Sequence, residues 1–180
     1  QWIENNVALG HRRLSIIDIS NAGKQPMITS DERWVLSYNG EVYNHKDIRK
    51  DLENKGVKFK SNADSEVVLN ALSIFGKSAL LLFNGMFALA LWDRKEKKLL
   101  LARDRYGIKP LYFSTKGENI IFASEQKAII TQRSFTKNIN KKTLLEYFTF
   151  QNILSNKTFF DDINMLPAGH YLEFDGGNGF

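Results

Sequence analysis

The hydrophobic positions of this chain follow two periods, and each period keeps to its own segments. Short apolar or alternating runs bounded by turn residues predict strands. These runs cover residues 7–11, 14–17, 27–29, 34–38, 57–60, 86–92, 98–103, 111–114, 120–123 and 170–174. Residues 1–6 are polar, and we expect no regular element there.

Apolar residues at intervals of three and four predict helices in other segments. These segments are residues 44–54, 64–75, 79–83, 125–131 and 141–150. Asn44, Asp64 and Asn140 stand where three of the helices begin, and Asn and Asp are preferred N-cap residues. Gly56 and Gly76 follow the first two helices and can end them. Because helices and antiparallel strands come in separate groups rather than in strict alternation, the pattern indicates an α+β fold.

The composition is that of one globular domain, and it excludes several kinds of site. Of 180 residues, 43% are hydrophobic and 25% are charged, which is ordinary for a domain with a sizeable core. There is no Cys, so disulfides, Cys-ligated metals and a thiol nucleophile are excluded within these residues. The three His show no metal-ligand spacing, and we expect no metal site.

The net charge of +5 does not by itself indicate a nucleic-acid ligand. A nucleic-acid binder gathers its basic residues on one face or along one helix, whereas the lysines here are scattered through predicted helices and loops. Nucleic-acid binding is therefore the minor alternative. No apolar run is long enough to span a bilayer, so we expect a cytoplasmic protein with neither a nucleic-acid nor a membrane partner.

The dipeptide Asn39-Gly40 has two interpretations. After the alternating run 34–38, Asn-Gly is a strong signal for a hairpin turn. Alternatively, an Asn side-chain amide and the next backbone N–H can aim two donors at one developing negative oxygen, which is an oxyanion hole. Taken alone, the dipeptide favours the turn.

Four motifs occur in a fixed order around this dipeptide. Gly-His-Arg-Arg-Leu-Ser-Ile spans residues 10–16, Tyr-Asn-Gly-Glu-Val-Tyr-Asn spans 38–44, Ala-Asp-Ser-Glu-Val spans 63–67, and Arg-Asp-x-x-Gly-x-x-Pro-Leu-Tyr spans 103–112. As a set, they resemble the glutamine-hydrolysing domain of asparagine synthetases. Those domains are class II glutamine amidotransferases of the N-terminal-nucleophile hydrolase type. The resemblance runs from about Ala8 to about Phe174.

The resemblance implies a four-layer αββα sandwich, with two antiparallel sheets between helical layers. It also implies that residues 1–180 are a single amidotransferase domain lacking its first segment, with residues 175–180 as a tail. Asparagine synthetases carry an ATP-using domain with a Ser-Gly-Gly-x-Asp-Ser phosphate loop, and that motif does not occur here. The ATP-dependent synthetase domain is therefore expected to lie outside this chain.

The family assigns roles to five residues of this sequence. Arg13 would grip the glutamine α-carboxylate with its planar fork of donors. Asp64 and Glu41 would hold the α-ammonium, and Asn39 with Gly40 would form the oxyanion hole. Each residue also has a plainer interpretation: Arg13 as a surface Arg, Asp64 as an N-cap, and Glu41 as an exposed strand residue.

Neighbouring motif residues are expected to be structural. Arg12 is assigned to the surface because neighbours on an extended segment face opposite ways. Glu66 is assigned to the first helical turn, where its charge complements the helix dipole. Asp104 and Gly107 are expected to shape a turn, and Pro110 to set the start of the next strand.

The resemblance also implies a reaction and its partners. The family nucleophile is a Cys at the mature N-terminus, so this chain alone is expected to bind glutamine but not hydrolyse it. The parent enzyme would pass ammonia to a C-terminal synthetase domain of the same polypeptide, which uses ATP and Mg²⁺ to convert aspartate to asparagine. No cofactor is expected in this chain, and a homodimer is compatible with the family. Two alternatives stay open: another acceptor (a sugar, peptide or polysaccharide), or a non-catalytic binding module on the same scaffold.

Overall fold

A five-stranded antiparallel sheet forms the centre of the computed structural model, which describes residues 1–12, 23–133 and 135–176. The strand order is β10-β6-β5-β4-β3. The strands are β3 (Met27–Ile28), β4 (Trp34–Val42), β5 (Gly85–Asp93), β6 (Lys98–Arg103) and β10 (Tyr171–Asp175). β4 and β5 pair along their whole lengths, from Trp34 opposite Asp93 to Val42 opposite Gly85. These two long strands make up most of the middle of the sheet.

Two smaller antiparallel sheets accompany the central one. The first has the order β8-β7-β9 and consists of β7 (Tyr112–Lys116), β8 (Asn119–Ala123) and β9 (Asn164–Met165). The second is a hairpin of β1 (Trp2–Glu4) and β2 (Val7–Leu9). β1 corrects our expectation for residues 1–6, since Asn5, at φ 49°, forms a turn between two pairing segments.

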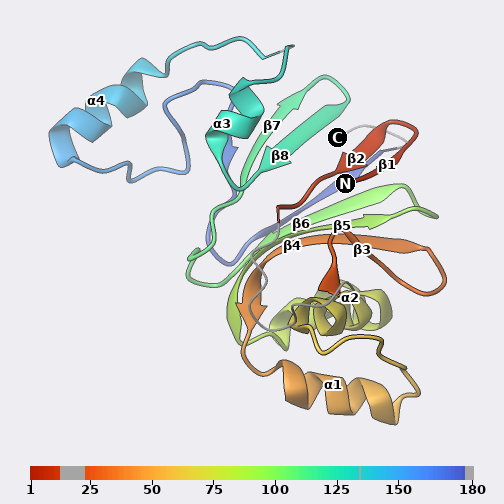
Figure 1. Cartoon of the computed structure of the whole chain (residues 1–180). Helices are drawn as coiled ribbons and strands as arrows, with labels where there is room; N and C mark the ends of the chain where they lie inside the picture. The colour runs from red at the N-terminus through yellow and green to blue at the C-terminus, as the bar shows by residue number, and fades with distance from the viewer. Residues whose placement is uncertain (13–22, 134, 177–180) are drawn as a thin grey trace.

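The helices cover the central sheet on one side. α1 (His45–Asn54), α2 (Asp64–Phe75) and the 3₁₀ helix η2 (Gly76–Leu81) follow β4 in the chain. Figure 1 shows α1 and α2 on one face of this sheet and β7 and β8 on the other. α3 (Gln126–Ile130) packs against β7 and β8 and represents the second helical layer. None of the helices in the described ranges is long and apolar enough to cross a membrane.

Two hydrophobic cores lie on opposite faces of the central sheet. On the helical side, Leu36 and Leu89 pack with Leu52 of α1 and Leu72 of α2. The core between the sheets is built from alternate positions of the same strands, together with residues of the smaller sheets: Leu9, Val35, Ala88, Ala90, Trp92, Leu99, Leu101, Leu111, Leu166 and Phe174. This alternation is the period of two that a strand covered on both faces requires.

Most predicted elements are present, and the predicted strand at residues 14–17 lies outside the described residues. Besides the expectation for residues 1–6, two others were wrong. The predicted strand at residues 57–60 does not form, and β9 had no recognised signal. Asn44 does lie at the N-cap of α1, but its side chain makes no cap bond. Instead its amide donates to Leu82 O at 3.0 Å and its carbonyl oxygen accepts from Asn84 N at 2.9 Å, which ties α1 to the start of β5.

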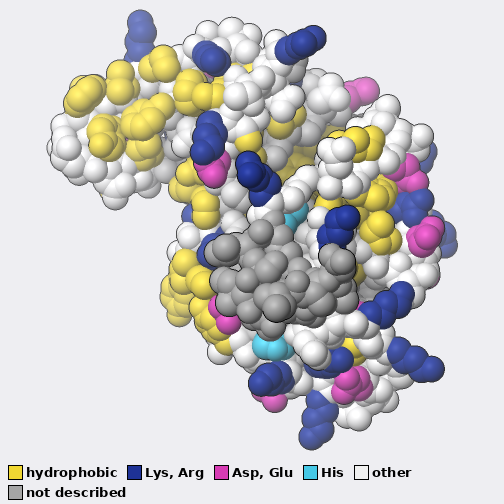
Figure 2. Space-filling view, in the orientation of Figure 1, with side chains coloured by type: hydrophobic (Ala, Val, Ile, Leu, Met, Phe, Trp, Pro, Cys, Tyr) yellow, Lys and Arg dark blue, Asp and Glu magenta, His cyan; other side chains and the backbone are white. Residues whose placement is uncertain are grey.

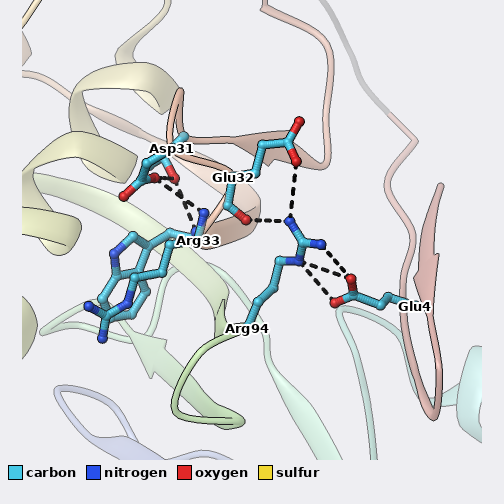
Figure 3. Close-up of polar contacts among 7 residues, drawn as sticks. Glu4, Asp31, Glu32, Arg33 and Arg94 are labelled. Carbon is cyan, nitrogen blue, oxygen red and sulfur yellow. Dashed lines mark hydrogen bonds and ion pairs between the residues drawn. The ribbon is translucent and has the colours of Figure 1, made fainter.

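A cluster of charged side chains fastens the β1–β2 hairpin to the central sheet (Figure 3). Arg94, directly after β5, donates through Nε and Nη2 to both carboxylate oxygens of Glu4 and through Nη1 to Glu32 O. This ion pair lowers the pKa of Glu4. Beside it, Arg33 binds Asp93 through two bonds of 3.0 and 2.6 Å. Both arginines use the two-donor geometry that suits a carboxylate.

The helix α4 (Lys141–Phe150) lies apart from the sheets in Figure 1. Asn140 caps it as predicted, accepting from Thr143 N at 3.0 Å. Four of its large hydrophobic side chains are exposed: Leu145, Tyr147, Phe148 and Phe150. Figure 2 shows hydrophobic side chains gathered in this region, while Lys and Arg are spread over the visible face.

Candidate active site

Strand β4 runs straight through Asn39-Gly40, so the hairpin interpretation of this dipeptide was wrong. Asn39 pairs with Ala88, and Gly40 with Phe87, within the β4–β5 ladder, which continues to Val42. A Cβ at Gly40 would lie 2.2 Å from Met86 O and 2.6 Å from Phe87 Cα. Glycine is therefore required here by the close approach of β5 rather than by a left-handed φ.

A cavity of about 780 Å³, which we call the inter-sheet cavity, opens beside this point and is lined by residues of the central sheet, of the start of α2, and of β8 and α3. Four of the five predicted site residues line it: Asn39, Gly40, Glu41 and Asp64. They come from the end of β4 and the start of α2. The fifth, Arg13, lies outside the described residues. Arg12 is exposed, as expected, but it also lines the cavity.

The Asn39 side chain points to the inter-sheet face of β4. Its pairing partner Ala88 belongs to the inter-sheet core, and paired residues share a face. Nδ2 of Asn39 donates to Ser124 Oγ, just after β8, at the long distance of 3.4 Å. Since a bond of this length is weak, the amide can exchange it for a ligand acceptor.

Asp64 is 6% exposed and joins α2 to β4. Its Oδ2 accepts from Tyr38 Oη at 2.8 Å and from Val42 N at 3.1 Å. The N-cap interpretation was wrong: Ala63 is the N-cap residue and Asp64 is the first residue of the helix. The other carboxylate oxygen, Oδ1, makes no hydrogen bond to another residue of the described ranges.

The Tyr38 hydroxyl acts as a fixed donor to this carboxylate. Burial, the charge of Asp64 and the bond to it all raise the pKa of the Tyr38 phenol well above its ordinary range. The hydroxyl is therefore protonated at neutral pH and holds Oδ2 of Asp64. Sequence reasoning missed this contact, which joins residues 26 positions apart.

Glu66 does not serve chiefly as a charge at a helix end, as we expected. It is 9% exposed, and Oε1 accepts from Lys60 N at 2.8 Å. Oε2 accepts from Ser61 N at 2.7 Å and from Ser61 Oγ at 2.6 Å. Glu66 thus fixes the loop that leads to Asp64. The sequence carried no recognised signal for this contact, because a capping box places its Ser three residues before the Glu, whereas Ser61 stands five residues before Glu66 and Ala63 is the N-cap.

The loop after β6 is organised by Asp104, as the motif predicted. This carboxylate is fully buried and accepts from the backbone N–H groups of Phe87, Tyr106, Ile108 and Lys109 at 3.0–3.2 Å. Burial raises its pKa, but the four backbone bonds outweigh burial and leave the pKa below the ordinary value. Gly107 adopts the left-handed φ of 65° that this turn needs.

A second groove of about 790 Å³ lies between α1 and η2. Its lining includes the apolar side chains of Ile48, Phe75 and Leu82 and the acidic side chains of Asp47 and Asp51. None of the five predicted site residues lines it. The inter-sheet cavity is the better candidate because side-chain and backbone donors meet carboxylates there.

Known proteins resemble this chain along nearly its whole length. Residues 1–179 match the family model of the glutamine amidotransferase domain. Asparagine synthetase (glutamine-hydrolyzing) 1 of Bacillus subtilis (strain 168) is 36% identical over 166 residues, which are 92% of this chain and 26% of that protein. Amidase chry2 of Gibberella zeae is 33% identical over 175 residues, which are 96% of this chain and 25% of that protein. The chain thus spans about a quarter of these relatives.

Solved structures show the same fold. Glutamine phosphoribosylpyrophosphate amidotransferase from B. subtilis, complexed with ADP and GMP, matches with a TM-score of 0.56 and 25% identity over 66% of this chain and 28% of its own. An allosteric regulatory enzyme of purine biosynthesis matches with a TM-score of 0.53 and 24% identity over 65% of this chain and 28% of its own. These matches confirm the predicted α+β fold of the N-terminal-nucleophile hydrolase type.

Proposed function

Since the chain belongs to the glutamine amidotransferase domain family, we propose that its inter-sheet cavity binds L-glutamine. The observation that carries the proposal is the meeting of Asn39, Gly40, Glu41 and Asp64 at that cavity. Free glutamine offers an ammonium, a carboxylate and a side-chain carbonyl. The cavity offers carboxylates for the first and amide donors for the third.

In this proposal, Oδ1 of Asp64 accepts a hydrogen bond from the substrate ammonium. Oδ2 is already held by Tyr38 and by the Val42 N–H, so the carboxylate presents its free oxygen in one orientation. Glu41 adds negative charge beside the same group. Arg13 is proposed for the α-carboxylate on the family motif alone.

Asn39 and Gly40 would bind the side-chain carbonyl oxygen of glutamine. Their two donors would stabilise the negative charge that develops on this oxygen when the amide is attacked, an effect worth about 10²–10³ in rate per donor in other enzymes. The 180 residues contain no Cys. We propose that they bind glutamine without hydrolysing it, because the family reaction uses a thiol nucleophile.

The ammonia acceptor is a second part of the proposal. The named asparagine synthetases among the relatives support amidation of aspartate to asparagine, with ATP and Mg²⁺ bound by a synthetase domain of the same polypeptide. The amidase among the relatives has a different name, so another acceptor stays open as the second candidate. The described site handles the donor, so the two acceptors predict the same glutamine contacts.

The first prediction is that Asp64→Asn weakens L-glutamine binding. The Asn oxygen can still accept from Tyr38 and Val42, so the fold is retained, while the charge opposite the ammonium is lost. We expect the Kd to rise about 10- to 100-fold, the equivalent of one charge-assisted hydrogen bond. Titration followed by ¹H–¹⁵N NMR measures the change.

Asp51→Asn is the matched control, because Asp51 is exposed on α1 and does not line the cavity. Its Kd should equal that of the original chain. An unchanged Kd in Asp64→Asn would remove Asp64 from the site. Binding of glutamine with no shift of any cavity amide would place the ligand elsewhere.

A further inference from the structure

β3 leaves part of the edge of β4 without a paired strand. On that edge, Gln25, which lies two residues before β3, makes an unusual side-chain contact. β3 pairs with β4 only through Met27 opposite Leu36 and Ile28 opposite Val35. Extending that register places Gln25 opposite Tyr38. There, Nε2 of Gln25 donates to Tyr38 O at 3.0 Å and its Oε1 accepts from Tyr38 N at 2.7 Å. One side-chain amide thus supplies both hydrogen bonds that a paired strand residue would give.

The amide of Gly40 lies on the same edge, two residues further along. Opposite Gly40, Phe87 directs its backbone groups to Asp104 at 2.8 and 3.2 Å rather than to β4. Gly40 and Phe87 are therefore a non-bonded pair, and the Gly40 N–H points away from β5. Its neighbours on this edge are satisfied, Tyr38 by Gln25 and Val42 by Asp64. Within the described ranges, the Gly40 N–H has no acceptor.

We propose that Gln25 is a positioning residue that aims the Asn39 side chain and the Gly40 N–H at the side-chain carbonyl of the ligand. This inference rests on the proposed glutamine site. Donors of an oxyanion hole act only if they are held in place before the ligand arrives. Gln25 fixes the backbone on one side of the donor pair, and Asp64 fixes it at Val42 on the other side.

The consequence is a role in specificity. Both ends of the Gln25 side-chain amide are bonded to the Tyr38 backbone, so Gln25 is not proposed to contact the ammonium or the carboxylate of the ligand. Its loss should disturb recognition of the carbonyl while leaving recognition of the α-amino and α-carboxyl groups intact. A residue that only stabilises the fold would affect both kinds of recognition equally.

The test compares two probes, L-glutamine and L-norvaline, on the full 180-residue chain. Norvaline has the same α groups and carbon skeleton but no side-chain amide. We expect the original chain to bind glutamine more tightly. In Gln25→Leu, the glutamine Kd should rise about tenfold, roughly one or two net hydrogen bonds, while the norvaline Kd stays the same. The Gly40 amide resonance, which should move with glutamine in the original chain, should no longer move.

Two further variants make the result decisive. Gln132→Leu removes the same amide from an exposed site outside the cavity and should leave both Kd values unchanged. Gln25→Glu keeps the acceptor for the Tyr38 N–H but loses the donor to Tyr38 O. It should show the same selective loss of glutamine binding to a smaller degree, and it serves as the test where Gln25→Leu does not fold.

Four outcomes would overturn the inference. Equal weakening of both probes would show that Gln25 only stabilises the fold, and unchanged glutamine binding would show that it has no role. If the original chain bound both probes equally, the oxyanion assignment would fail while the ammonium site stood. If it bound neither, the proposed function itself would fall, and the inference with it.

Discussion

At the scale of single residues, the buried carboxylate of Asp104 organises a large part of the surrounding backbone. It binds four backbone N–H groups from β5 and from the loop after β6. Arg103 completes the arrangement by donating to the carbonyl oxygens of Gly107, Lys109 and Leu166 at 2.6–2.8 Å. Together, Asp104 and Arg103 fix the end of β6 and the loop that follows it, beside the candidate site.

We predict that Asp104→Asn destabilises the chain by about 2–3 kcal/mol at neutral pH. The neutral amide offers weaker acceptance, and its NH₂ group faces backbone donors. Because the folded pKa of Asp104 is lowered, its stabilising effect is present above the unfolded pKa of about 3.9 and is lost as the pH falls through the folded pKa. Urea denaturation should show a difference between the two proteins that is constant near neutrality and shrinks in acid. A difference that grows on acidification would contradict this account.

Residue-scale expectations from the sequence were good where the partners are local. Asp104 and Gly107 lie three residues apart, and the turn between them was predicted. The partner of Asp64 could not be predicted, because Tyr38 reaches it only once β4 lies against the start of α2. Gln25 and Tyr38 became recognisable as partners only when the β3–β4 register was known.

At the scale of elements, β4 and α2 form the unit that presents the site. Periodicity predicted both of them, since their apolar residues repeat regularly. It misplaced Asn39-Gly40, because the preference of Asn-Gly for turns has the same appearance in a sequence as a glycine needed for close strand contact. Only the position of β5 separates the two causes.

We predict that Glu66→Gln loosens the start of α2 and costs about 1–3 kcal/mol, because its neutral amide replaces a carboxylate bound by three donors. Hydrogen exchange should accelerate at the Lys60 and Ser61 amides. Glu173→Gln is the control, since Glu173 of β10 makes an exposed ion pair with Lys77, outside this loop, and exposed pairs contribute about 0.2–1 kcal/mol. Equal effects in the two variants would show that the Glu66 contacts do not order this helix start.

At the scale of the whole molecule, the central sheet is shared by two cores. Residues of β4 alternate between them, with Val35 in the inter-sheet core and Leu36 in the helical core. If one core were lost, one apolar face of the central sheet would be exposed to water. We therefore expect both cores to unfold together. The sequence indicated the α+β class through its grouped elements, but the stacking of a second sheet on the first was expected only from the family resemblance, because residues 111–123 have no pattern that specifies which face they cover.

The last prediction tests this coupling with two matched substitutions, Val35→Ala in the inter-sheet core and Val68→Ala in the helical core. Both side chains are fully buried, and each change removes two methyl groups, so each should cost about 2 kcal/mol. Because the two sites lie on opposite faces of the sheet, their effects should add within about 0.5 kcal/mol. Far-UV circular dichroism and tryptophan fluorescence should record one coincident transition in every variant.

Leu145→Ala on exposed α4 is the control and should barely change stability. If Val35→Ala instead separated an early fluorescence transition from a later loss of helix, the two cores would be independent units, and the cavity between the sheets could open while α1, α2 and β4 stayed folded.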